Sequence, residues 1–134
     1  MAYWLVKSDP ETYSWQDLLK DKKTTWDGVR NYQARNNLML MEIGDPVLVY
    51  ESQSPKYVAG IAKVSKTHFP DITSEDNRWV AVELKAVSSL KNPVTLEIIK
   101  STPELKDIAL IRQSRLSVMP LTEIEYNTII RLSK

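Results

Sequence analysis

The hydrophobic and polar positions of this chain change pattern several times along its length, and each pattern predicts an element. Residues 2–7 are a short apolar run of aromatic and branched side chains, which is typical of a buried strand. Residues 45–52 and 57–66 are two more strand-like runs separated by QSPK, which predicts a hairpin with Gly60 at a bulge or a close approach. Residues 78–87 alternate apolar and polar side chains, as a half-buried strand does. Together these runs predict a sheet.

Two helices are predicted in the first third of the chain. Ser14, followed by an acid three residues later, resembles a capping signal for a short helix over residues 15–21. Residues 32–44 contain good helix formers, and Gly44 stands where a helix C-terminus favours glycine. Between these helices, residues 26–31 contain an Asp-Gly turn pair, so we expect a loop that leads into the second helix.

The second half of the chain predicts a loop, a last strand and three short helices. Residues 67–77 are polar and interrupted by proline, which indicates a surface loop. Residues 94–101 and 102–110 have the pattern of two short helices, and residues 115–121 have that of the final strand. A Thr/Glu capping box opens the closing helix over residues 122–132.

The order of these elements favours an α+β fold. The strands do not alternate regularly with helices, which argues against a doubly wound parallel sheet and for a mixed, curled sheet or small barrel. The chain has no internal repeat, low-complexity tract or Gly/Ser linker. Because 134 residues suffice for one hydrophobic core but not for two, we expect a single domain over residues 1–134.

The composition excludes several classes of function. With no Cys and one His, the chain cannot form disulfides, thiolate metal sites or an all-imidazole zinc site. No carboxylate cluster has the spacing of a calcium or magnesium site, so we expect no metal and no cofactor. No apolar run is long enough to cross a bilayer and the N-terminus does not resemble a signal peptide, so we expect no membrane partner and a cytoplasmic location. A formal net charge of +1 indicates that any nucleic-acid binding uses a local patch and a shaped pocket.

Catalytic motifs are absent. The chain contains no nucleophile elbow, no HExxH metal motif, no P-loop and no GxGxxG fingerprint. A general-base role is open to His68, but a surface or packing role is more common for a lone histidine in a loop. The residues therefore favour binding over catalysis.

Four tryptophans could give the chain a stacking surface for a planar ligand. Trp15, on the apolar face of a short helix, and Trp4, in a buried strand, are better explained as core residues. Trp26 differs because it stands among Thr, Asp and Gly at a turn, without periodic apolar neighbours. A ligand-facing role and a core role are both open for Trp26.

Polar residues follow Trp26 closely. Directional donors and acceptors that suit the edge of a base or a phosphate are offered by Arg30, Asn31, Gln33, Arg35 and Asn36. The alternative is a solvated helix start in which Asn31 is the N-cap and Arg35 or Asn37 faces water. Both roles can coexist along one helix entrance.

Further polar residues stand at the ends of predicted strands, which are natural positions for the rim of a pocket. Lys7 and Ser8 follow the first strand, and Tyr50 and Ser52 end another. Arg115 adds a basic group in front of the final strand, where a phosphate contact and an ordinary surface role are equally open.

Several of these segments together resemble the EVE-domain family. The resemblance rests on YWLVKSDP, WDGVRNYQARNNL, GDPVLVYES, RWVAVEL and RLSVMP, and it runs from Ala2 to the C-terminal helix. It implies a PUA-like fold related to YTH and ASCH domains, that is, a mostly antiparallel β pseudo-barrel with short helices packed around it. The family's many small bacterial members make a bacterial intracellular protein the expectation.

What the resemblance implies about function is a non-catalytic module that binds DNA or RNA carrying a modified base, such as a modified cytosine in DNA or a methylated adenine. Such a base must leave the stack, which costs a few kcal/mol. Trp26 would form the stacking wall, and Asn31 would read the base edge with backbone groups near Val29 and Arg30. The remaining residues divide into those that close the pocket, Ser8, Tyr50 and Ser52, and those that contact phosphate, Lys7, Arg30 and Arg115.

Two departures from the family pattern bear on this expectation. Many members have Phe-Tyr-His-Ser where this chain has VYES, so Glu51 replaces a histidine and the role of that position in ligand choice is open. The loop HFPDITSEDNRW is shorter than in many relatives, which would leave the pocket more open. The alternatives are an RNA-processing or base-modifying enzyme of the ASCH type and a protein-interaction adaptor, which would need an exposed apolar patch away from the pocket.

Overall fold

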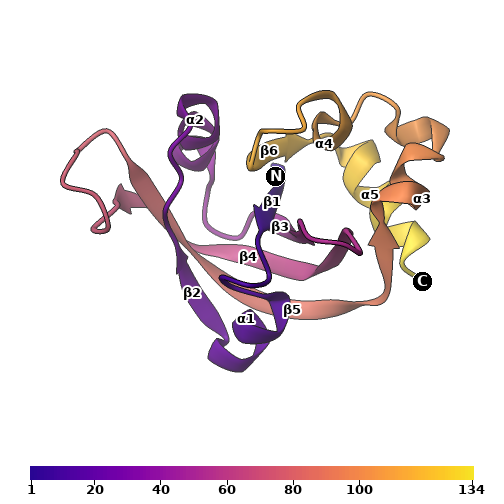
Figure 1. The fold of residues 1–134 in the computed structure, drawn as a ribbon, viewed down its shortest axis with the longest axis horizontal. Coiled ribbons are helices and arrows are strands. Elements are labelled where there is room, and N and C mark those ends of the chain that lie inside the picture. Colours follow the sequence, from indigo (N-terminus) through magenta and orange to yellow (C-terminus); the bar gives the residue numbers. More distant parts are fainter.

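The computed structural model describes all 134 residues, and its centre is one six-stranded sheet (Figure 1). The strands are β1 (Tyr3–Ser8), β2 (Lys23–Trp26), β3 (Pro46–Glu51), β4 (Tyr57–Pro70), β5 (Val80–Thr95) and β6 (Val118–Leu121). Their order across the sheet is β2-β5-β4-β3-β1-β6. Only β1 and β3 pair in parallel; every other pair is antiparallel.

Short helices connect and cover these strands, and the last three helices gather at one end of the molecule (Figure 1). They are α1 (Trp15–Asp21), α2 (Tyr32–Leu40), α3 (Leu96–Lys100), α4 (Ala109–Arg112) and α5 (Glu123–Leu132), with a 3-10 turn η1 (Pro103–Leu105). A single cluster of 32 buried apolar residues forms the core. The prediction of an α+β, mostly antiparallel fold with short helices around it is confirmed.

The sheet is larger than the sequence pattern predicted. Strand β2 lies between the predicted first helix and the predicted loop, where the sequence pattern predicted no element, and it pairs with β5 alone, with Trp26 opposite Val82. An edge strand of four residues with exposed Lys23 and Thr25 carries too little alternation to be recognised. Likewise β4 continues to Pro70, into the predicted loop, because its polar end still pairs with β5.

Gly60 lies where a tryptophan ring meets the backbone. A Cβ atom added there would stand 2.1 Å from the Trp15 ring, so only glycine fits. The Trp15 indole N–H donates to the Ser89 hydroxyl at 2.9 Å, and its backbone N–H donates to the Glu51 carboxylate. The prediction of a close approach at Gly60 is confirmed, and Trp15, like Trp4, is a core residue.

Helix α2 ends earlier than predicted. It begins after Asn31, whose side chain accepts from the Ala34 N–H, but it ends at Leu40, four residues before Gly44. After the extended C-cap residue Met41, the buried Asp45 carboxylate accepts the Glu42 N–H at 2.9 Å. Gly44 therefore serves the turn into β3, where its φ of +91° suits glycine, and its prediction as a helix terminator is wrong.

One residue of α2 is buried against expectation. The Asn37 side chain donates to the Val118 carbonyl at 2.7 Å, so it packs the helix onto β6 and does not face water. Toward the C-terminus, residues 94–95 belong to β5, and the predicted helix over residues 102–110 divides into η1 and α4. The capping boxes that open α1 and α5 are confirmed.

Candidate functional site

A cleft of about 490 Å³ opens between the end of β1, the turn before α1, strand β2 and the loop over residues 27–30. Most of its lining is polar, and its apolar part comes from Tyr13, Trp26 and Val29. Trp26 is 9% exposed and also belongs to the core, so a ligand would meet only part of its surface. Trp26 is therefore a core residue that also lines the cleft, and its ligand-facing role stays a prediction.

The cleft brings together five of the residues predicted for the site, and these are Lys7, Ser8, Trp26, Val29 and Arg30. They come from the first strand and from the WDGVR segment, which the fold places side by side. No backbone or side-chain hydrogen bond engages the N–H of Val29 or of Arg30, so both donors are free for a ligand.

Four predicted residues lie outside the cleft, and these are Asn31, Tyr50, Ser52 and Arg115. The expected place of the first three in the base pocket is therefore corrected. Tyr50 is buried in the core, because β3 is covered on both faces and the end of the strand is not a rim. The Ser52 hydroxyl and N–H both donate to the Ser8 carbonyl, so Ser52 holds the end of β1 and does not line the cleft.

Asn31 and Arg115 line a second hollow of about 350 Å³ beside the N-terminus of α2. The Asn31 side-chain oxygen caps the helix by accepting from the Ala34 N–H at 2.9 Å, which leaves its NH₂ group available. Arg115 is exposed and makes no ion pair. Arg112 joins them, although its guanidinium also pairs with Asp107 at 2.6 Å.

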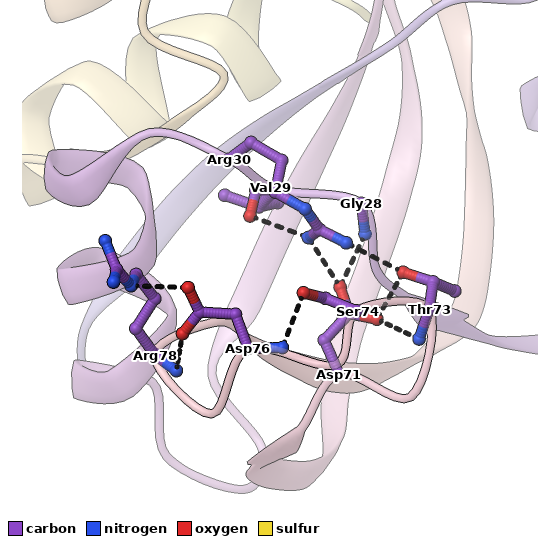
Figure 2. A network of polar contacts seen from close by, with 8 residues as sticks. All are labelled: Gly28, Val29, Arg30, Asp71, Thr73, Ser74, Asp76 and Arg78. Carbon is purple, nitrogen blue, oxygen red and sulfur yellow. Dashed lines mark hydrogen bonds and ion pairs between the residues drawn. The ribbon is translucent and has the colours of Figure 1, made fainter.

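Asp71, in the loop after β4, holds two residues of the cleft wall in place (Figure 2). Its Oδ2 atom accepts from the Gly28 backbone N–H and from the Arg30 guanidinium, both at 2.9 Å. Its Oδ1 atom accepts from the backbone N–H and the hydroxyl of Thr73. The Arg30 guanidinium also donates to Thr73 and lies 5.7 Å from the centre of the Trp79 ring.

The loop that carries Asp71 is braced by its own polar contacts (Figure 2). The Ser74 hydroxyl accepts from the Asp76 N–H, and the Asp76 carboxylate accepts from the Arg78 N–H and pairs with its guanidinium at 2.7 Å. This short loop therefore has a defined shape, and it holds residues 28–30 in place.

Burial of the Asp71 carboxyl by itself would raise its pKa. The hydrogen bonds from Thr73, Arg30 and Gly28 outweigh this effect and lower the pKa from 3.8 to about 2. Asp71 is therefore ionised at neutral pH and neutralises part of the charge of Arg30, whose side chain is 38% exposed. Arg30 is a structural member of the cleft as well as a cation on its wall.

Lys7 connects the cleft with the second hollow. Its ammonium group donates to the Ser114 carbonyl at 2.7 Å, and Ser114 lines that hollow. Burial lowers the pKa of Lys7, and the charge of Lys56 lowers it further. The contact fixes the cation at the boundary between the two depressions.

The two depressions differ in charge. The cleft carries two cations, Lys7 and Arg30, and two carboxylates, Asp9 and Asp27. The second hollow carries two arginines and no acid among its lining residues. The cleft thus suits a neutral polar ligand with an aromatic face, whereas the hollow suits an anion.

The sequence predicted no site role for Tyr13 and Asp27, which line the cleft, or for Asp71 and Thr73, which bond to residues 28 and 30 of its wall. The sequence placed Asp71 and Thr73 in a surface loop, and no local pattern reveals a partner 41 residues away. Asp27 was visible only as half of a turn pair, although its place between Trp26 and Gly28 was a signal that could have been used.

Other features of the chain lie outside the cleft. Glu51 is buried, accepts from the Trp15 backbone N–H and lines a separate small hollow. His68 is exposed on β4. No group of three or more His, Asp or Glu residues stands close enough together to hold a metal ion, and none of the helices has the length and apolarity needed to cross a membrane.

Exposed apolar side chains, which an adaptor would require, occur at the end of α2. Met39, Leu40 and Ile43 are exposed there and do not line the cleft. Exposed apolar residues are common on soluble proteins, and nothing in the structure covers these three, so their exposure does not define a partner.

The fold and the cleft define a small α+β domain with one polar, aromatic-walled depression and a basic hollow beside it. The chain belongs to the EVE domain family, whose model matches residues 2–132. Human thymocyte nuclear protein 1 is 33% identical to it over an alignment that covers 99% of this chain and 74% of the human protein.

Solved structures agree with this assignment. Human THYN1 protein in complex with DNA that contains 5-methylcytosine matches with a TM-score of 0.95 at 32% identity, covering 100% of this chain and 98% of the human one. An ASCH protein from Zymomonas mobilis matches with a TM-score of 0.65 at 15% identity, covering 97% of each chain, which shows a common fold alone.

Proposed function

We propose that this protein is a non-catalytic reader of DNA that takes one modified base, extruded from the helix, into the Trp26 cleft. The observation that carries the proposal is that the cleft is lined by Trp26 together with residues 27–30 and the end of β1, so an aromatic ring and polar groups face one depression. These residues lie within the part of the chain that the EVE domain model matches. The human relative that was solved with 5-methylcytosine DNA has the same fold over the whole of this chain.

The chemistry of the cleft supports a base as its ligand. Its volume of about 490 Å³ lies within the range of roughly 300 to 1,000 Å³ that is typical of small-ligand pockets. The Trp26 ring offers a surface for stacking, and the free N–H groups of Val29 and Arg30 can donate to ring nitrogens or carbonyl oxygens. A cleft whose charges balance favours a neutral base over a phosphate.

The phosphates next to the extruded base would lie on the second hollow. Arg115 and Asn31 line it, and Lys7 stands at its border with the cleft. Arg115 has no carboxylate partner, so its charge is available to a phosphodiester. Arg30 is a weaker candidate for that role because Asp71 already pairs with it.

Equilibrium binding to a panel of fluorescent duplexes tests the proposal. The duplexes differ only at one central base, which is cytosine, 5-methylcytosine, adenine or N6-methyladenine, and matched RNAs complete the panel. Wild-type protein is expected to bind one modified DNA more tightly than its unmodified counterpart. Equal affinity for every modified duplex and its unmodified counterpart would contradict the proposal. Preferential binding to the matched RNAs would show that the ligand is RNA and not DNA.

Two variants separate the roles of the two depressions. Trp26→Phe, which keeps an aromatic ring in the core, is expected to reduce the preference for the modified base, since Phe offers a smaller stacking surface. Trp26→Ala is less useful because it would leave a cavity in the core. Arg115→Gln is expected to weaken binding to all sequences alike. It should also reduce the slope of log affinity against log salt concentration by about 1, because one fewer phosphate is neutralised.

A further inference from the structure

Asp27 differs from the other carboxylate in the cleft. It follows Trp26 directly, it is exposed, and its carboxylate makes no hydrogen bond or ion pair within the protein. Asp9, by contrast, accepts from the Glu11 N–H and from the Gln53 amide through its Oδ1 atom. Asp27 therefore contributes nothing visible to the fold and offers its full accepting capacity to the cleft.

The neighbouring groups limit what the cleft can offer a ligand. The Ser8 hydroxyl donates to the Tyr13 carbonyl, so toward a ligand it can act only as an acceptor. The N–H groups of Val29 and Arg30 are free donors. The cleft thus presents free acceptors on Asp27 and Ser8 together with free backbone donors on the next residues.

This set of groups matches one kind of base edge. Cytosine and adenine each carry an exocyclic amino donor next to a ring nitrogen that accepts, whereas thymine and uracil carry a carbonyl oxygen in place of the amino group. A carboxylate accepts well from an amino group, but it repels a carbonyl oxygen and leaves both groups without a partner.

We propose that Asp27 selects an amino-bearing base, because its carboxylate accepts a hydrogen bond from the exocyclic amino group of cytosine or adenine and disfavours thymine and uracil. This assignment rests on the proposed function, since it requires a base in the cleft. It is separate from recognition of the modification, because 5-methylcytosine and thymine carry the same ring methyl group and differ on the edge that Asp27 would read.

That pair of bases provides the test. Duplexes carry 5-methylcytosine or thymine at one position, each opposite an abasic site, so that neither base has a partner to lose when it leaves the stack. Wild-type protein is expected to bind the 5-methylcytosine duplex about tenfold or more tightly than the thymine duplex. In Asp27→Ala the two affinities are expected to come within about twofold of each other, chiefly because binding of 5-methylcytosine weakens.

Glu123→Ala is the matched control, because it removes one carboxylate from an exposed position at the start of α5, outside the cleft. It is expected to keep the wild-type preference, and thermal melts of both variants check that the fold is retained. If wild-type protein binds neither of these duplexes nor any modified duplex of the panel described above, the proposed function fails. If it binds both equally, or if Asp27→Ala keeps the full preference, the assignment of Asp27 is overturned while the proposed function stands.

Discussion

The Asp71 carboxylate lies 2.9 Å from the Arg30 guanidinium, although 41 residues separate them in the sequence. The same oxygen of Asp71 also accepts the Gly28 N–H, so a single buried acid fixes the backbone and a side chain of the cleft wall (Figure 2). The loop after β4 therefore determines the shape of the loop after β2. The geometry of the candidate base site depends on a residue that does not line it.

Asp71→Asn is expected to lower the free energy of unfolding by about 2 kcal/mol, because it removes a buried carboxylate that accepts four hydrogen bonds. Urea unfolding measures the change. Asp107→Asn is the control, since Asp107 pairs with Arg112 on the exposed surface and should cost less than about 1 kcal/mol. Equal effects of the two substitutions would show that the Asp71 network adds no stability.

The pH dependence of stability follows from the same carboxyl. Its pKa in the folded protein is about 2, below the ordinary 3.8, so its contribution is fully present above pH 4 and is lost as the pH falls toward 2. The difference in free energy of unfolding between wild type and Asp71→Asn should be largest at neutral pH and shrink over that interval. Asp76, Glu83 and Glu104, whose pKa values are also lowered, are present in both proteins and cancel. A difference that stays constant down to pH 2 would contradict this account.

Gly60→Ala is expected to destabilise the protein by about 1 to 3 kcal/mol, because the new methyl group would overlap the Trp15 ring. Thermal unfolding reports the loss. A double substitution with Trp15→Leu should cost less than the sum of the two single changes, since the smaller side chain makes room. Strict additivity would show that the strain has another source.

The sequence predicted the elements whose signals are local. The capping residues of α1 and α5 and the close approach at Gly60 were visible because each depends on a few neighbouring residues or on one residue type. Strand β2 was missed because a short polar edge strand is defined by its partner, β5. Tyr50 was wrongly predicted to lie on the pocket rim. The strand β3 that carries it is covered on both faces, and the sequence of a single strand does not reveal what covers it.

The residues of the candidate site likewise divide into those with a local sequence signal and those that depend on a distant contact. Trp26 and Arg30 stood out as a polar and aromatic turn, and the fold brings them to one cleft with Lys7 and Ser8. The role of Asp71 depends on a contact across the sheet edge that no spacing in the chain encodes.

Amide NMR spectra during titration with a duplex that contains 5-methylcytosine test the central claim most directly. The account predicts that the largest chemical shift changes occur at the indole N–H of Trp26 and at the amides of Gly28, Val29 and Arg30. Unmodified duplex should shift chiefly the amides around Arg115. Changes confined to another surface, such as the exposed end of α2 near Leu40, would contradict the assignment of the cleft as the base site.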